Sequence, residues 1–179
     1  MRREQLEHVL RAACTIARTD AALVIGSQAI LGSFTDDALP EAAVRSIEVD
    51  VTFLDDPDDE RSDQVDGAIG ELSQFHETFG YYAQGVSIST AVLPSGWRDR
   101  LVVLDTPGTS PGRGMCLEPH DVVASKLVAH REKDLEFASA LLSARVISAQ
   151  TLHDRIGSLP VEDDYRERLH HWVTAASRA

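Results

Sequence analysis

Two carboxylates, Glu48 and Asp50, are the residues whose type and spacing point most directly to chemistry. Residues 46–53 alternate between polar and apolar side chains, which is the pattern of a β-strand with one buried face. Side chains at positions i and i+2 of a strand leave the same face, with their Cα atoms roughly 7 Å apart. Their oxygens can therefore share or bracket Mg²⁺ or Mn²⁺, ions that prefer oxygen ligands. The plainer alternative is a half-exposed strand whose acids face water.

A Gly-Ser pair, Gly26-Ser27, follows a short apolar run at residues 21–25 and precedes a short helix expected from Gln28. Backbone N–H groups and a small hydroxyl at such a turn can bind phosphate oxygens, and glycine permits close approach of the backbone. The pair alone is more often only a turn or a cap. Ser46 lies two residues before Glu48 on the same predicted strand face, so its hydroxyl is expected to open into the same cleft.

A third group comprises Lys126, His130, Lys133 and Asp134, which are spaced to lie along one helix face. A lysine there can neutralise charge on a triphosphate or on leaving pyrophosphate. Asp134 could orient a basic side chain or join the metal ligands. The alternative is a solvated, salt-bridged helix face, and His130 by itself is better explained as a structural or surface histidine.

The elements that must position these residues follow from hydrophobic periodicity. A helix is predicted at 4–18, strands at 21–25, 46–53, 81–90 and 101–104, and a helix carrying Ile69, Leu72 and Phe75 after the acidic segment. Residues 106–112 read as a linker, and the chain is expected to be helical beyond it, at 119–131, 134–145, 148–157 and 160–176. This predicts an α/β (α+β) fold with a small mixed-sheet core at 1–110 and a C-terminal helical region at 111–179.

Composition limits the class of protein further. The 179 residues are 43% hydrophobic and carry a net charge of -12, of which the segment 55–66 alone supplies -6. That balance argues against unspecific polyanion binding but leaves room for a local phosphate site. No apolar run suggests a membrane span or a signal peptide, and two cysteines without motif spacing fit a reducing cytoplasm.

Gly26-Ser27 followed about twenty residues later by Glu48-Val49-Asp50 resembles the nucleotidyltransferase superfamily, whose pattern is Gly-Ser followed by Asp-x-Asp. Two further blocks, Arg45 to Asp50 and Lys126 to Asp134, are similar to those of the AbiEii-type and MenT toxins, nucleotidyltransferases of bacterial toxin–antitoxin systems. The resemblance spans about residues 20–145.

This resemblance implies an enzyme that transfers a nucleoside monophosphate from a nucleoside triphosphate to an acceptor, plausibly RNA or a tRNA end, under the restraint of an antitoxin protein. It implies Glu48, Asp50, Lys126 and Asp134 as catalytic residues, with Glu48 and Asp50 as the ligands of Mg²⁺ or Mn²⁺. The nucleotide-binding residues would be Gly26, Ser27, Ser46 and Arg131.

The chain departs from the family pattern in two ways. Glu48 stands where the family usually has aspartate, and the expected later strand, Val86 to Thr90, lacks the third carboxylate that many nucleotidyltransferases have. Three alternatives stay open: one metal ion suffices, Asp105 or Asp134 substitutes, or activity is weak or lost. Two other functions therefore stay open: a nucleotidyltransferase that modifies small molecules such as antibiotics, and a catalytically silent module that binds a nucleotide or a protein.

Overall fold

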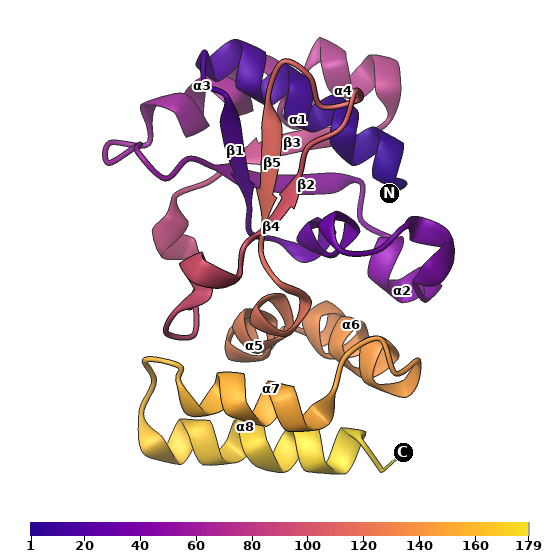
Figure 1. Cartoon of the computed structure of the whole chain (residues 1–179), viewed down its shortest axis with the longest axis vertical. Coiled ribbons are helices and arrows are strands. Elements are labelled where there is room, and N and C mark those ends of the chain that lie inside the picture. Colours follow the sequence, from indigo (N-terminus) through magenta and orange to yellow (C-terminus); the bar gives the residue numbers. More distant parts are fainter. Residues whose placement is uncertain (179) are drawn as a thin grey trace.

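The computed structural model describes residues 1–178, and its centre is a five-stranded mixed sheet in the order β3-β2-β1-β5-β4 (Figure 1). The strands are β1 (Ala21–Val24), β2 (Glu48–Thr52), β3 (Tyr82–Gly85), β4 (Val102–Leu104) and β5 (Arg113–Cys116). β1 pairs in parallel with β5 and antiparallel with β2, while β2 is parallel to β3 and β4 is antiparallel to β5. The mixed α/β fold expected from the sequence is confirmed.

Helices lie at both ends of this sheet in the view of Figure 1. At one end are α1 (Arg3–Ala17), α3 (Glu60–Ile69) and α4 (Gln74–Phe79), and the short α2 (Glu41–Val44) lies beside the sheet. At the other end α5 (Pro119–Ala129) and α6 (Glu132–Ser143) lie between the sheet and the pair α7 (Ala149–Gly157) and α8 (Asp163–Ala176). None of the helices within residues 1–178 combines the length and the apolar character that crossing a membrane requires.

The apolar faces that the periodicity predicts form the core. On α1, Leu6, Val9, Leu10 and Ala13 are fully buried, as an amphipathic helix packed on a sheet requires. Val49 and Val51 of β2 are also fully buried, whereas Glu48 and Asp50 on its other face are half-buried. The alternation at the centre of this strand is therefore confirmed.

The predicted strand at 46–53 and the helix carrying Leu72 are wrong in their extents. β2 spans only Glu48–Thr52, so Ile47 is 48% exposed and Thr52 is buried. The helix after the acidic segment is two helices, because Leu72 takes a left-handed conformation (φ 62°) between α3 and α4 and lies exposed. Left-handed backbone cannot continue a right-handed helix.

Two other predicted elements also differ. The strand expected at 81–90 ends at Gly85, and after it the Ser87 hydroxyl accepts a hydrogen bond from the Ser89 N–H at the start of a 3-10 helix, η3 (Ile88–Thr90). The helix expected from Gln28 is the six-residue 3-10 helix η1 (Ser27–Gly32).

The expectation that the chain is helical after the linker is wrong at its first step, because Arg113–Cys116 form β5 between β1 and β4. A Cβ at Gly114 would lie 2.6 Å from Leu10 Cδ1, so a strand residue without a side chain is required where α1 crosses the sheet. The division at residue 110 stays a prediction, but this sheet strand lies on its C-terminal side. The four helices that follow begin and end within three residues of their predicted bounds.

Candidate active site

Every site residue predicted from the sequence lines one cleft of about 640 Å³ between the sheet and helices α5 and α6. The residues that the structure brings together there are Gly26, Ser27, Ser46, Glu48, Asp50, Lys126, Arg131 and Asp134. They come from segments that are about a hundred residues apart in the chain. Their meeting in one cleft is a finding, whereas their individual roles stay predictions.

The Gly26 turn lies directly against Asp50. The Ile25 N–H donates to the Asp50 carbonyl at 3.2 Å, continuing the β1–β2 pairing up to the turn. A Cβ at Gly26 would lie 1.8 Å from Asp50 Oδ2, so no larger residue fits while this carboxylate keeps its place. The requirement for glycine is therefore set by Asp50, in addition to any approach of a phosphate. Because η1 is a short 3-10 helix, it offers less of a macrodipole than the α-helix that a phosphate site commonly uses.

Glu48 and Asp50 project into the cleft beside each other, as the strand spacing predicts. Burial, together with the hydrogen bond and the charge of Glu48, raises the pKa of Asp50 to about 7, while Lys126 and Lys133 act in the opposite direction. Tyr82, which is paired with Glu48 across the parallel β2–β3 register, donates its hydroxyl to Glu48 Oε2 at 3.2 Å. Burial and then the Glu48 charge raise the pKa of Tyr82 to about 12, so it stays a donor at neutral pH.

The basic side of the cleft is built differently from the single helix face that the spacing suggests. The chain turns at His130 (φ 54°), where α5 ends, so Lys126 lies on α5 and Asp134 on α6. The turn brings them into contact: Lys126 Nζ donates to Asp134 Oδ1 at 3.0 Å, and Arg131 Nε donates to Oδ2 at 2.7 Å. Lys126 Nζ also lies 5.6 Å from the centre of the Phe137 ring.

Asp134 is 1% exposed, and both of its oxygens accept hydrogen bonds from these two cations. Its burial favours the neutral acid, but the hydrogen bonds from Arg131 and Lys126 outweigh that effect and hold the pKa of Asp134 below its usual value. The Lys126 side chain is only 14% exposed, so the expected salt bridge is present but its lysine is not solvated. Asp134 contacts two basic side chains, and its role stays a prediction.

Ser46 lies just before β2, and its hydroxyl is engaged with the backbone of Glu48. The Glu48 N–H donates to Ser46 Oγ at 3.1 Å, and Ser46 Oγ donates to the Glu48 carbonyl at 3.2 Å. Ser46 thus lines the cleft but also fixes the start of the strand that carries the carboxylates. At the rim, Arg45 and Glu136 form an exposed ion pair at 3.3 Å between the segment after α2 and α6.

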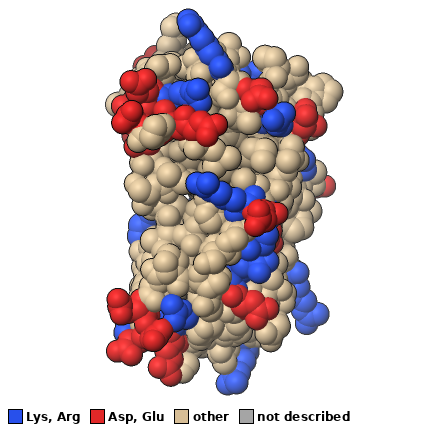
Figure 2. All heavy atoms as spheres, turned by 60° about the vertical axis from the view of Figure 1, so that its left-hand side comes forward, with Lys and Arg blue, Asp and Glu red and all other residues tan. Residues whose placement is uncertain are grey.

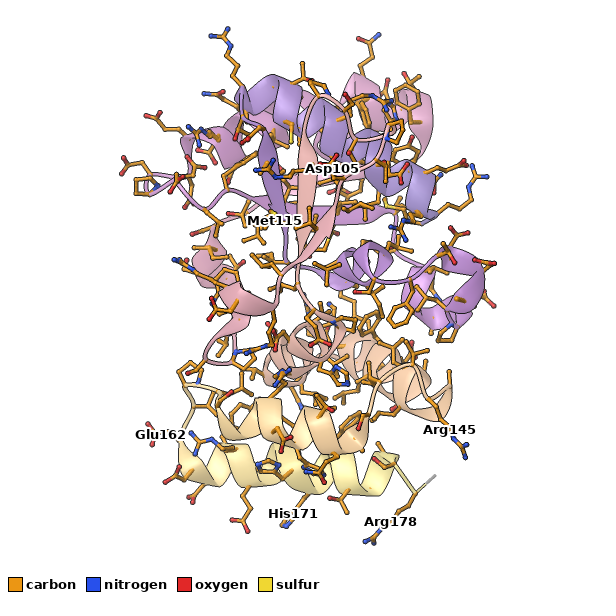
Figure 3. The ribbon with its side chains drawn as sticks, viewed as in Figure 1. Asp105, Met115, Arg145, Glu162, His171 and Arg178 are labelled. Atoms are coloured by element: carbon orange, nitrogen blue, oxygen red, sulfur yellow. The ribbon has the colours of Figure 1, made fainter. Side chains whose placement is uncertain are left out.

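No third carboxylate joins Glu48 and Asp50 within the described residues 1–178, where no group of three or more His, Cys, Asp or Glu could hold a metal ion. Asp105 is exposed and does not line the cleft, because β4 runs antiparallel to β5 and ends at the edge of the sheet away from α5 to α8 (Figure 3). The position paired with Asp50 on β3 is Gln84, a neutral amide.

The chemistry of the two carboxylates nevertheless fits a divalent cation. They are oxygen donors of like charge in a partly buried place, where burial and the neighbouring Glu48 raise the pKa of Asp50. Mg²⁺ is commonly held by one or two carboxylates, with water and substrate phosphates as its other ligands. A pair is therefore sufficient for a metal that enters together with a triphosphate.

Sequence reasoning missed two side chains of this cleft, Tyr82 and Gln28. Tyr82 acquires its place only through the register of β2 with β3, which no local pattern reveals. Gln28 was treated as the first residue of a helix, whereas its side chain is buried in the cleft wall. A further part of the wall is apolar and includes Val86, Ala91 and Val92.

The surface charge varies along the molecule. On the face shown in Figure 2, acidic side chains gather towards the upper and lower ends, and the band between them is largely uncharged, with basic side chains predominating among its charged ones. The net charge of -12 therefore does not describe the middle of this face. An anionic ligand meets less repulsion there than the total charge suggests.

Comparison with known families gives one match. A family model described as "Nucleotidyltransferase of unknown function (DUF6036)" matches residues 4–176, nearly the whole chain. No curated protein and no solved structure matches the chain.

Proposed function

The chain belongs to this DUF6036 family of nucleotidyltransferases, and from that premise we propose that it transfers a nucleoside monophosphate from a nucleoside triphosphate to an acceptor hydroxyl. The observation that carries the proposal is the meeting of Gly26-Ser27, Glu48, Asp50 and Lys126 in one cleft. A carboxylate wall faces a basic wall there, which suits a triphosphate bound together with a divalent cation.

Each group has a distinct part in the proposed reaction. The acceptor oxygen forms a bond to the α-phosphorus and its proton passes to water, while the bond from that phosphorus to the bridging oxygen breaks and pyrophosphate leaves. Glu48 and Asp50 would hold Mg²⁺ or Mn²⁺, which when bound neutralises phosphate charge. The Gly26-Ser27 turn would bind phosphate oxygens, and Lys126 would stabilise the charge that develops on the leaving pyrophosphate.

Asp134 has an indirect part in this proposal. It holds the ammonium of Lys126 and the guanidinium of Arg131 on the same side of the cleft, with both of its oxygens occupied. Arg131 keeps a 59% exposed side chain, so part of its guanidinium can meet a phosphate. Such preorganised donors cost no rearrangement when negative charge develops.

We further propose RNA, plausibly a tRNA end, as the acceptor, and a toxin restrained by an antitoxin as the biological role. The support is the resemblance of the Arg45–Asp50 and Lys126–Asp134 blocks to AbiEii-type and MenT toxins, together with the basic band in Figure 2. The reaction would take place in the cytoplasm, where triphosphates and tRNA meet and where the free thiols of Cys14 and Cys116 stay reduced.

One experiment tests both the transfer reaction and the RNA acceptor. The protein is incubated with each α-labelled nucleoside triphosphate, Mg²⁺ or Mn²⁺, and total RNA. Label in RNA that is absent with Asp50→Asn supports the proposal. Label in an added small molecule but not in RNA would favour the antibiotic-type enzyme. Binding of a triphosphate without any transfer would favour the silent module, and the absence of both binding and transfer would overturn the proposed function.

The toxin role needs a separate test in cells. Induced expression of the wild-type chain is expected to stop bacterial growth, whereas expression of Asp50→Asn at the same level is not. Normal growth with the wild-type chain, in a strain that lacks any neighbouring antitoxin gene, would contradict the toxin role while leaving the transferase proposal intact.

A further inference from the structure

Gln28, the second residue of η1, is 1% exposed and lines the cleft next to Ser27. Its amide nitrogen, Nε2, lies 3.3 Å from Ser27 Oγ and 3.3 Å from the Ala43 carbonyl oxygen on α2. One buried amide thus links the predicted phosphate-binding turn to the opposite helix of the cleft wall.

The direction of these two hydrogen bonds determines what the serine can do. An amide nitrogen only donates, so Ser27 Oγ must accept from Gln28. The serine hydroxyl hydrogen cannot return to that nitrogen and is available to another acceptor. Because Ser27 lines the cleft, a phosphate oxygen entering there would be such an acceptor.

The amide oxygen of Gln28 indicates that this arrangement is not required by the fold. Among residues 1–178, Gln28 Oε1 is buried and has no hydrogen-bond partner. A buried carbonyl without a donor costs free energy, and an apolar side chain of the same length would avoid that cost. Such a side chain would, however, also leave the Ala43 carbonyl without its donor. The stability of the fold therefore does not account for the unpaired oxygen.

We propose that Gln28 is a positioning residue for nucleoside triphosphate binding, which acts through Ser27 by keeping its hydroxyl hydrogen directed at the phosphates. This inference rests on the proposed function and deepens it. Gln28 does not touch the substrate, and its effect on binding exists only while the serine hydroxyl is present. A purely structural link between η1 and α2 through Ala43 would lack that dependence.

The test is a double-mutant cycle with Gln28→Met, Ser27→Ala and the double variant, using calorimetric binding of ATP, CTP, GTP and UTP with Mg²⁺. Loss of the hydroxyl should weaken binding about tenfold, and Gln28→Met about three- to tenfold, as expected for a hydrogen bond to a charged group. The double variant should bind no more weakly than Ser27→Ala. The melting temperature of Gln28→Met should change little, because removal of the unpaired oxygen offsets loss of the hydrogen bond to Ala43.

A matched control is Gln64→Met, which removes an exposed amide on α3 outside the cleft and should leave the affinity unchanged. Gln28→Asn, shortened by one methylene, supplies a second variant with the same expected coupling if the methionine variant does not fold. Wild-type affinity in a folded Gln28 variant, or an effect that persists undiminished without the Ser27 hydroxyl, would overturn the inference alone. A wild-type protein that binds none of the four triphosphates would overturn the proposed function as well.

Discussion

Asp50 and Asp134 are two aspartates of the same cleft with opposite electrostatic environments. Asp50 is paired with a second carboxylate, and burial and Glu48 raise its pKa to about 7. Asp134 is only 1% exposed, yet Lys126 and Arg131 donate to both of its oxygens and keep its pKa below the usual value. Burial acts in the same direction on both, so the neighbours decide the difference.

Asp50 thus lies beside another carboxylate, whereas Asp134 lies in contact with two cations. The two carboxylates of β2 lie beside each other in a partly buried place, and burial and the charge of Glu48 disfavour the charged form of Asp50. On the α5–α6 side, Asp134 holds Lys126 and Arg131 in place, and their two positive charges exceed its single negative charge. The cleft therefore joins a wall with two carboxylates, the proposed metal ligands, to a basic wall.

The largest expected effect tests the carboxylate wall, formed by Glu48 and Asp50. Asp50→Asn should reduce Mn²⁺ affinity and nucleotide transfer by at least about 10²-fold, because even residues that only support metal ligands cost 10- to 100-fold. Its melting temperature should be equal to or above that of the wild type, since one of two repelling carboxylates is removed. Calorimetry measures the Mn²⁺ affinity and thermal melting measures the melting temperature, with the exposed Asp58→Asn as the control. A strongly destabilised Asp50→Asn variant would show that the two walls do not differ in this way.

The second effect tests the basic wall, where Lys126 contacts Asp134. Lys126→Met should lower turnover by about 10²–10³-fold and also lower the free energy of unfolding by about 1–3 kcal/mol, because it leaves a buried Asp134 oxygen with one partner fewer. Adding Asp134→Asn should recover most of the stability but not the turnover. Urea unfolding measures the free energy of unfolding, and a nucleotide-transfer assay measures the turnover. Full turnover in Lys126→Met would remove the lysine from the proposed mechanism.

The opposite pKa shifts of Asp50 and Asp134 predict that the two residues affect stability differently as the pH changes. Asp50 has a raised folded-state pKa, so its contribution to stability falls as pH rises from about 4 to about 7 and stays low above that. Asp134 has a lowered pKa, so its contribution is present above about pH 4 and is lost as pH falls further.

Urea unfolding between pH 3 and pH 8 should therefore show two distinct changes. Asp50→Asn should gain stability relative to the wild type as pH rises to 7. The stability deficit of Asp134→Asn should shrink below pH 4. Parallel curves for all three proteins would contradict the assignment of opposite environments.

The smallest effect concerns the rim. The Arg45–Glu136 ion pair joins the segment after α2 to α6, whereas the buried contacts of Asp134 join α5 to α6, and its side chains are 65% and 54% exposed. Glu136→Gln should change the free energy of unfolding by no more than about 0.5 kcal/mol. A change above about 1 kcal/mol would mean that the rim, and not the buried contacts of Asp134, holds the cleft together.

Strand alternation and apolar helix spacing in the sequence predicted the carboxylate side of the cleft and the C-terminal helices. Strand alternation gave Glu48 and Asp50 a common face, because that periodicity depends only on local geometry. Helix bounds in the C-terminal region followed from apolar spacing and from Pro119, which is the first residue of α5.

What depends on three-dimensional contacts was not predictable. β5 contains Arg113, Gly114 and Met115, a composition with little strand preference, and the glycine has its reason only in the approach of Leu10. The contact of Lys126 with Asp134 depends on the turn at His130, a left-handed position without glycine. The predicted helix bounds indicate a break near this residue but not the direction that the chain takes after it. The pairing of Tyr82 with Glu48 likewise required the sheet register.

The order of the strands in the sheet has a consequence for the time course of synthesis. β5 lies between β1 and β4, so β1 is complete at residue 24 but obtains its second neighbour only when residues 113–116 have been made. At roughly 5–20 residues per second, about 4–18 s separate these two events on the ribosome. During that interval the nascent chain has an open β1 edge, the kind of edge that pairs with other chains.

A nascent chain stopped after residue 110 should therefore be captured by chaperones or aggregate. One released from the ribosome after residue 117 should be captured less, because it can close the sheet.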